Sequence, residues 1–142
     1  MIDYSSLISA AAESELNIIA YSNNSDHRVS DDIADSLCSF DGPETRLDLR
    51  LFGAIDLFMD FPKDGSRIPG YIRSAQVLCF SNLEHANREM TELIQEAMER
   101  RSFGGEQLPN LRSVIVSYDS ADNLQEIAEL QKLGPSVVLG FS

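Results

Sequence analysis

The chain has 142 residues, 43% of them hydrophobic and 24% charged, and it carries 23 Asp plus Glu against 11 Lys plus Arg, a formal net charge of −12. This length predicts a single domain over residues 1–142, and the composition excludes a wholly disordered chain. No apolar run approaches the ~20 residues of a membrane span, and the N-terminus lacks the pattern of a signal peptide. Two cysteines, Cys38 and Cys79, cannot form a disulfide framework, so we expect a cytoplasmic protein.

The first elements are two helices on either side of a strand. Apolar residues at helical spacing predict a helix over residues 4–13, and residues 16–21 (LNIIAY) read as a buried strand. Ser30 is then the expected N-cap of a second helix, which Gly42-Pro43 ends.

Residues 46–61 show the clearest pattern in the chain, because every odd position is apolar or glycine. This alternation predicts β-structure with the odd positions buried and the even ones, such as Asp48, on the other face. One strand of sixteen residues would extend roughly 50 Å. We therefore expect a bend or break near Gly53, and either one bent strand or two strands fit the pattern.

The C-terminal half alternates between strands and helices. Ser81 with Glu84 three residues on forms a capping-box pattern that predicts the start of a long helix. The expected strands are residues 72–80, 112–118 and 136–141, and the expected helices are residues 83–101 and 121–133. A βαβαβ order of this kind favours parallel strands covered by helices. The predicted fold class is thus α/β, a mixed sheet in one domain with helices packed on it.

No catalytic or metal-binding constellation stands out. His85 falls on the polar side of its predicted helix, His27 lies in a polar loop, and neither cysteine has an electropositive setting that would activate it. Serine-hydrolase elbows, paired histidines at metal spacing and calcium loops are all missing from the sequence. We therefore predict no catalytic residue, no metal and no cofactor, and lean away from an enzyme.

The charge suggests the first function, a small binding protein. A net charge of −12 disfavours binding to nucleic acid and to anionic membranes, and it favours a basic protein partner. The densest excess of acids surrounds the second predicted helix: Asp31, Asp32, Asp35, Asp41 and Glu44. The hypothesis is an inhibitor or sequestering protein, such as an immunity-type toxin inhibitor or a viral counter-defence protein. A merely solvated acidic face is the alternative interpretation.

The architecture suggests a second function, a small-ligand or nucleotide-binding domain, in which case it could be an enzyme. Ligands of open α/β sheets bind beyond the carboxyl ends of the strands. In this chain those ends carry Ser81, Asn82, Asp119 and Ser120. Neither turn is rich in glycine, and Asp119 would place a negative charge where a phosphate would lie. Serine and aspartate are also ordinary helix caps.

Overall fold

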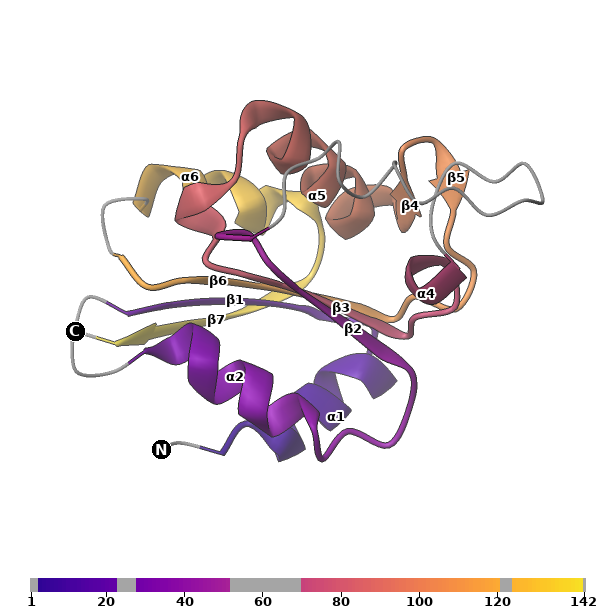
Figure 1. The fold of residues 1–142 in the computed structure, drawn as a ribbon, viewed down its shortest axis with the longest axis horizontal. Coiled ribbons are helices and arrows are strands. Elements are labelled where there is room, and N and C mark those ends of the chain that lie inside the picture. Colours follow the sequence, from indigo (N-terminus) through magenta and orange to yellow (C-terminus); the bar gives the residue numbers. More distant parts are fainter. Residues whose placement is uncertain (1–2, 23–27, 52–69, 121–123, 142) are drawn as a thin grey trace.

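The protein, described by a computed structural model over residues 3–22, 28–51, 70–120 and 124–141, is built around a five-stranded parallel sheet (Figure 1). The strand order is β2-β3-β6-β1-β7. The strands are β1 (Asn17–Ser22), β2 (Glu44–Asp48), β3 (Val77–Ser81), β6 (Ser113–Tyr118) and β7 (Ser136–Phe141). Every neighbouring pair runs parallel, so the α/β class predicted from the sequence is confirmed.

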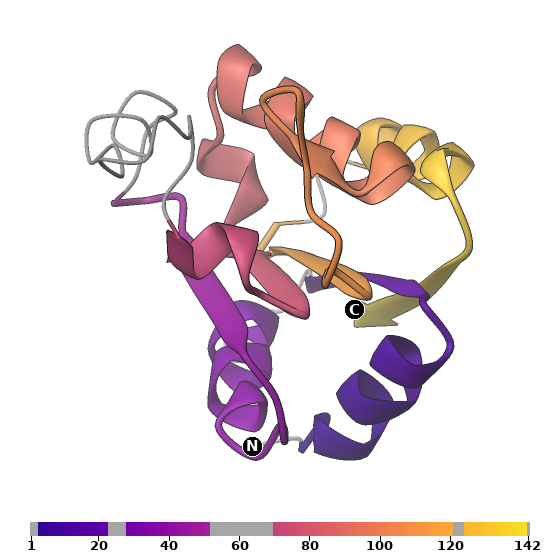
Figure 2. The same ribbon diagram turned by 90° about the vertical axis from the view of Figure 1, so that its right-hand side faces the viewer.

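Helices cover both faces of this sheet. One face carries α1 and α2, and the other carries α4, α5 and α6 (Figures 1 and 2). The helices are α1 (Ser5–Glu13), α2 (Val29–Leu37), α4 (Gly70–Arg73), α5 (Arg88–Arg100) and α6 (Leu124–Leu130), with short 3₁₀ turns η1 (Leu83–His85) and η2 (Gln131–Leu133). A separate antiparallel hairpin consists of β4 (Ser102–Phe103) and β5 (Glu106–Gln107). None of the helices described is long and apolar enough to cross a membrane.

The central strands are apolar on both sides because both sides are covered. In β1, Ile18 packs with α1 and α2 while the next residue, Ile19, packs with α5 on the other face. In β6, Ile115 packs on the face of α1 and α2, and Val116 packs on the face of α5. Short uninterrupted apolar runs are typical of such doubly covered parallel strands.

The expected strand over residues 46–61 is only partly correct. β2 covers its first residues and ends at Asp48, and residues 49–51 form a turn. Leu47 and Leu49 are buried as the alternation predicts, whereas Leu51 is 75% exposed. The rest of this segment, including Gly53, lies outside the described residues.

The segment after β2 also differs from the prediction. Residues 70–73 form α4 instead of the start of a strand, and Ser81 closes β3 instead of capping a helix. The long helix predicted over 83–101 is interrupted, because η1 ends before Ala86 and α5 begins after Asn87. The side-chain oxygen of Asn87 accepts a hydrogen bond from the backbone amide of Met90, so Asn87 is the N-cap of α5.

Substitution of Leu49 and Leu51 tests where the alternation stops. Leu49→Asp buries an unpaired charge and should lower the free energy of unfolding by about 3 kcal/mol or more. Leu51→Asp, the same change at an exposed position two residues on, should alter it by less than about 0.5 kcal/mol. Urea unfolding followed by circular dichroism measures both values. Equal losses in the two variants would contradict a strand that ends at Asp48.

Candidate functional site at the carboxyl edge of the sheet

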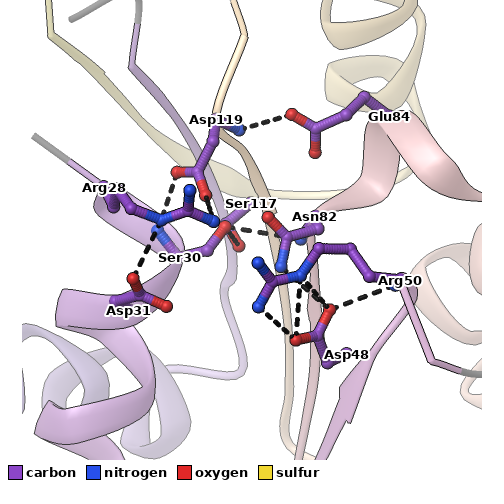
Figure 3. A network of polar contacts seen from close by, with 9 residues as sticks. All are labelled: Arg28, Ser30, Asp31, Asp48, Arg50, Asn82, Glu84, Ser117 and Asp119. Carbon is purple, nitrogen blue, oxygen red and sulfur yellow. Dashed lines mark hydrogen bonds and ion pairs between the residues drawn. The ribbon is translucent and has the colours of Figure 1, made fainter. Parts of the chain in front are cut away.

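The carboxyl ends of β1 and β6 form the place where this topology favours a ligand. These strands are neighbours, and the chain leaves β1 toward α2 on one face but leaves β6 toward α6 on the other (Figure 1). Connections that diverge in this way define the switch point at which open α/β sheets bind ligands. Figure 3 shows that polar side chains from α2, β6 and the segments after β2 and β3 meet there.

Two buried serines join α2 to the sheet. The hydroxyl groups of Ser30 in α2 and Ser117 in β6 are 2.7 Å apart, and both residues are buried. The backbone amide of Asn82 also donates to the Ser30 hydroxyl, at 3.3 Å. Ser30 was predicted as the N-cap of this helix, but it lies inside the first turn and its side chain points toward the sheet.

Asp119 lies on the N-terminus of α2. One of its carboxylate oxygens accepts the Ser30 amide at 3.2 Å, and the other is 3.2 Å from the guanidinium of Arg28. Arg28 also pairs with Asp31 at 2.9 Å, and the Asp119 amide donates to Glu84 at 2.8 Å. A carboxylate is stabilised by the partial positive charge of a helix N-terminus, as a bound anion would be. The protein's own side chain therefore occupies this anion position.

Asp48 holds a second part of the network, at the end of β2. It pairs with Arg50, whose Nη2 is 2.6 Å from Oδ2, and it accepts the Asn82 side-chain amide at 2.9 Å. Hydrogen bonds from Arg50, and to a lesser degree from Asn82, lower the pKa of Asp48 to about 2. Asn82 itself has a left-handed backbone (φ 59°), which turns its side chain toward β2.

Two groups beneath this edge are held in their neutral form. Burial raises the pKa of the Tyr118 hydroxyl well above its ordinary value, and the nearby carboxylates of Glu126 and Glu84 raise it further. Burial likewise raises the pKa of the Cys79 thiol to about 12. The thiolate is the nucleophilic form of cysteine, so Cys79 is not activated.

Two other candidate groups for chemistry are exposed. His85 directly follows Glu84 at the end of η1, and Cys38 follows α2 at the surface with Arg46 at 3.7 Å from its sulfur. His27 lies outside the described residues. Within the described part of the chain, no group of three or more His, Cys, Asp or Glu side chains could hold a metal ion.

The structure brings together two of the four residues predicted for a ligand site. Asn82 and Asp119 both belong to the network, whereas Ser81 ends β3, where its carbonyl accepts the Leu49 amide. Ser120 is half-buried directly after Asp119. Sequence reasoning missed these members of the network: Arg28, Ser30, Asp48, Glu84, Arg50 and Ser117. The position of Arg28 and Ser30 directly between a strand and a helix was a signal for the first two.

The five acids predicted for partner binding lie on α2, on the segment that leads into β2 and at the first residue of β2. Asp35 and Asp41 are exposed and form no ion pair with another described residue. Asp31 pairs with Arg28, and Glu44 pairs with Arg46 at 3.4 Å. Asp32 is half-buried, and its charge contributes to the raised pKa of Tyr4.

A cavity of about 270 Å³ lies at the other, amino end of the sheet. Its lining includes Asp41, Gln76 and Arg112, which precede β2, β3 and β6. It is therefore separate from the network at the carboxyl edge.

The lowered pKa of Asp48 makes the network sensitive to acid. Because the pKa of the folded state is below the unfolded value near 4, this carboxylate contributes its full stabilisation above about pH 4 and loses it as the pH falls toward 2. The loss should be on the order of 1–2 kcal/mol, allowing for partial exposure to solvent. Urea unfolding between pH 7 and pH 2 should show this loss in the wild type. Asp48→Asn should lack that component, and an unchanged pH profile in the variant would contradict the assignment.

Comparisons with known proteins support the fold only. No protein-family model matches the sequence, and no curated protein matches it. Two structures of NtrX from Brucella abortus are similar to this chain, one with ADP bound (TM-score 0.61, 14% identity) and one without it (TM-score 0.60, 16% identity). Each similarity covers 95% of this chain but 34% and 35% of the NtrX chains. This chain thus spans about a third of the length of NtrX, and at such low identity the two share an α/β fold.

Proposed function

We propose that this protein is a binding protein without enzymatic activity, which engages a basic protein partner through the acidic surface around α2. The observation that carries the proposal is the Asp119 carboxylate on the N-terminus of α2, paired with Arg28. This is the position in which the fold would otherwise hold an anionic ligand. With that position filled from within, the exposed surface is the better candidate for the functional part of the molecule.

The charge of the surface supports a basic partner. The chain carries a formal net charge of −12, and Asp35 and Asp41 extend from α2 and from the loop before β2 into solvent. Such a field speeds the encounter with a cationic protein and repels anionic ones. Covering a functional surface of that partner would inhibit or sequester it, as an immunity-type toxin inhibitor or a viral counter-defence protein does.

A nucleotide is the second candidate ligand, since Asn82 and Asp119 both belong to the network at the switch point, and NtrX, similar to this chain over about a third of its own length, has been solved with ADP. The network speaks against it. Its four carboxylates (Asp31, Asp48, Glu84 and Asp119) outnumber the two guanidinium groups of Arg28 and Arg50. A phosphate entering here would have to displace Asp119 and would face the remaining negative charge.

A thermal-shift measurement tests whether the carboxyl edge binds a nucleotide. About 1 mM ADP or ATP with magnesium should leave the melting temperature unchanged to within about 1 °C. A nucleotide bound with a Kd near 10 µM would instead stabilise the fold by about 2.7 kcal/mol and raise the melting temperature by several degrees. NtrX serves as the positive control for ADP. A shift of that size in this protein would overturn the proposal in favour of nucleotide binding.

Charge reversal at the exposed acids tests the partner surface. Cross-linking in cells that make the protein identifies the partner, and surface binding kinetics over a salt series then compare the variants. Asp35→Lys with Asp41→Lys should lower the association rate about tenfold at low salt and flatten its salt dependence. Asp32 is left unchanged because it is half-buried beside Tyr4.

The matched control makes the same change of charge on the opposite face of the sheet. Glu89→Lys with Glu99→Lys alters two exposed residues of α5, and this pair should have a clearly smaller effect. Equal effects of the two pairs would mean that only the net charge matters. A preserved association rate in the Asp35 and Asp41 variant would place the docking surface elsewhere.

A further inference from the structure

The two edges of the sheet differ in charge. β2 forms one edge, and three of its five residues are charged: Glu44, Arg46 and Asp48. β7 forms the other edge, and its sequence, SVVLGF, contains no charged residue. β7 pairs with β1 along all six residues, and among the described residues no strand pairs with its other side.

An open strand edge presents unpaired backbone groups that can pair with another chain. Proteins normally protect such edges with charged side chains, proline, bulges or a covering element. β2 carries charged side chains, whereas β7 carries none, and among the described residues no strand pairs with its outer side. Val138, in the middle of β7, is 38% exposed. Two residues on, Gly140 is also exposed, although the ring of its β1 neighbour Tyr21 lies so close that a β-carbon at Gly140 would be 2.5 Å from the tyrosine hydroxyl.

We propose that β7 is a self-association surface, on which a second copy of this chain pairs its own β7 antiparallel about a twofold axis. The sheet would then continue through ten strands. With the axis perpendicular to the sheet, residues opposite each other share a face, so Val138 lies opposite Val138 of the second copy and Val137 opposite Leu139.

The charge distribution permits a second copy at this edge. Chains that each carry −12 repel one another, and an uncharged strand edge adds no local repulsion to this. Antiparallel self-pairing of β7 brings no like charges together. The same arrangement centred on β2 would place Arg46 directly opposite Arg46, which is destabilising.

This association has a salt dependence opposite to that of binding a basic partner. A six-residue strand pair buries less area than a standard stable interface, so the dimer should be weak and should depend on concentration. Added salt screens the repulsion between the two acidic chains and should strengthen the dimer. Salt would weaken the binding of a cationic protein, so the two proposals stand or fall separately.

Sedimentation equilibrium at about 10 to 500 µM, in low and in high salt, tests the proposal. The mean mass of the wild type should rise from 15.8 kDa toward twice that value with concentration, and more steeply in high salt. Val138→Lys should keep the monomer mass throughout, because it places two ammonium groups opposite each other. Leu51→Lys is the control. It adds the same charge at an exposed leucine in the turn after β2, and this variant should dimerise like the wild type.

Cysteine trapping tests the register without adding a charge to the strand. In a Cys38→Ser background, Val138→Cys should form an interchain disulfide under mild oxidation, whereas Glu89→Cys on α5 should not. A wild type that stays monomeric over the whole range would overturn the proposal. So would a Val138→Lys variant that dimerises like the wild type, or equal trapping at the two cysteine positions.

Discussion

The contact between Asp119 and the N-terminus of α2 is the interaction on which the carboxyl edge depends. It joins the end of β6 to the amide of Ser30 and to the guanidinium of Arg28, while the Asp119 amide is held by Glu84 after β3. A charge at a helix N-terminus contributes about 0.3–1 kcal/mol at an exposed site and up to about 2 kcal/mol when partly buried. The Asp119 side chain is largely buried, so the upper part of this range applies. One carboxylate thus both fixes α2 on the sheet and fills an anion site.

Parts of the fold that depend on local pattern could be predicted from the sequence, and the cap of α2 could not. The ranges expected for α1, β1, β6 and β7 agree with the structure to within one or two residues, since apolar spacing determines each of them. Serine is a favoured residue type at the N-cap. However, the backbone amide of Ser30 donates its hydrogen bond to Asp119, 89 residues further along the chain. Only the tertiary fold brings these two together, so no sequence window contains the contact.

The predicted strand continued past Asp48, and the predicted helix began directly after Ser81. Both predictions were wrong for the same physical reason: a polar side chain forms a hydrogen bond with a partner that the local sequence does not indicate. Asp48 accepts the Arg50 amide and guanidinium, which turns the chain although the alternation of apolar residues continues. Glu84 was expected to complete a capping box with Ser81, yet its carboxylate accepts the Asp119 amide. Asn82, between Ser81 and Glu84, has a left-handed backbone, and α5 begins only after its N-cap Asn87.

The composition of the network reverses the usual preference of this edge. A helix N-terminus at the switch point of an α/β sheet attracts anions, because its amide groups carry partial positive charge. Here that charge is already met by Asp119, and Asp31, Asp48 and Glu84 add three carboxylates against the guanidinium groups of Arg28 and Arg50. The balance is negative, in line with the −12 of the whole chain. A helix N-terminus that would otherwise attract an anion is therefore surrounded by negative charge, which is the sign of charge that the proposed basic partner would meet at the exposed acids of α2.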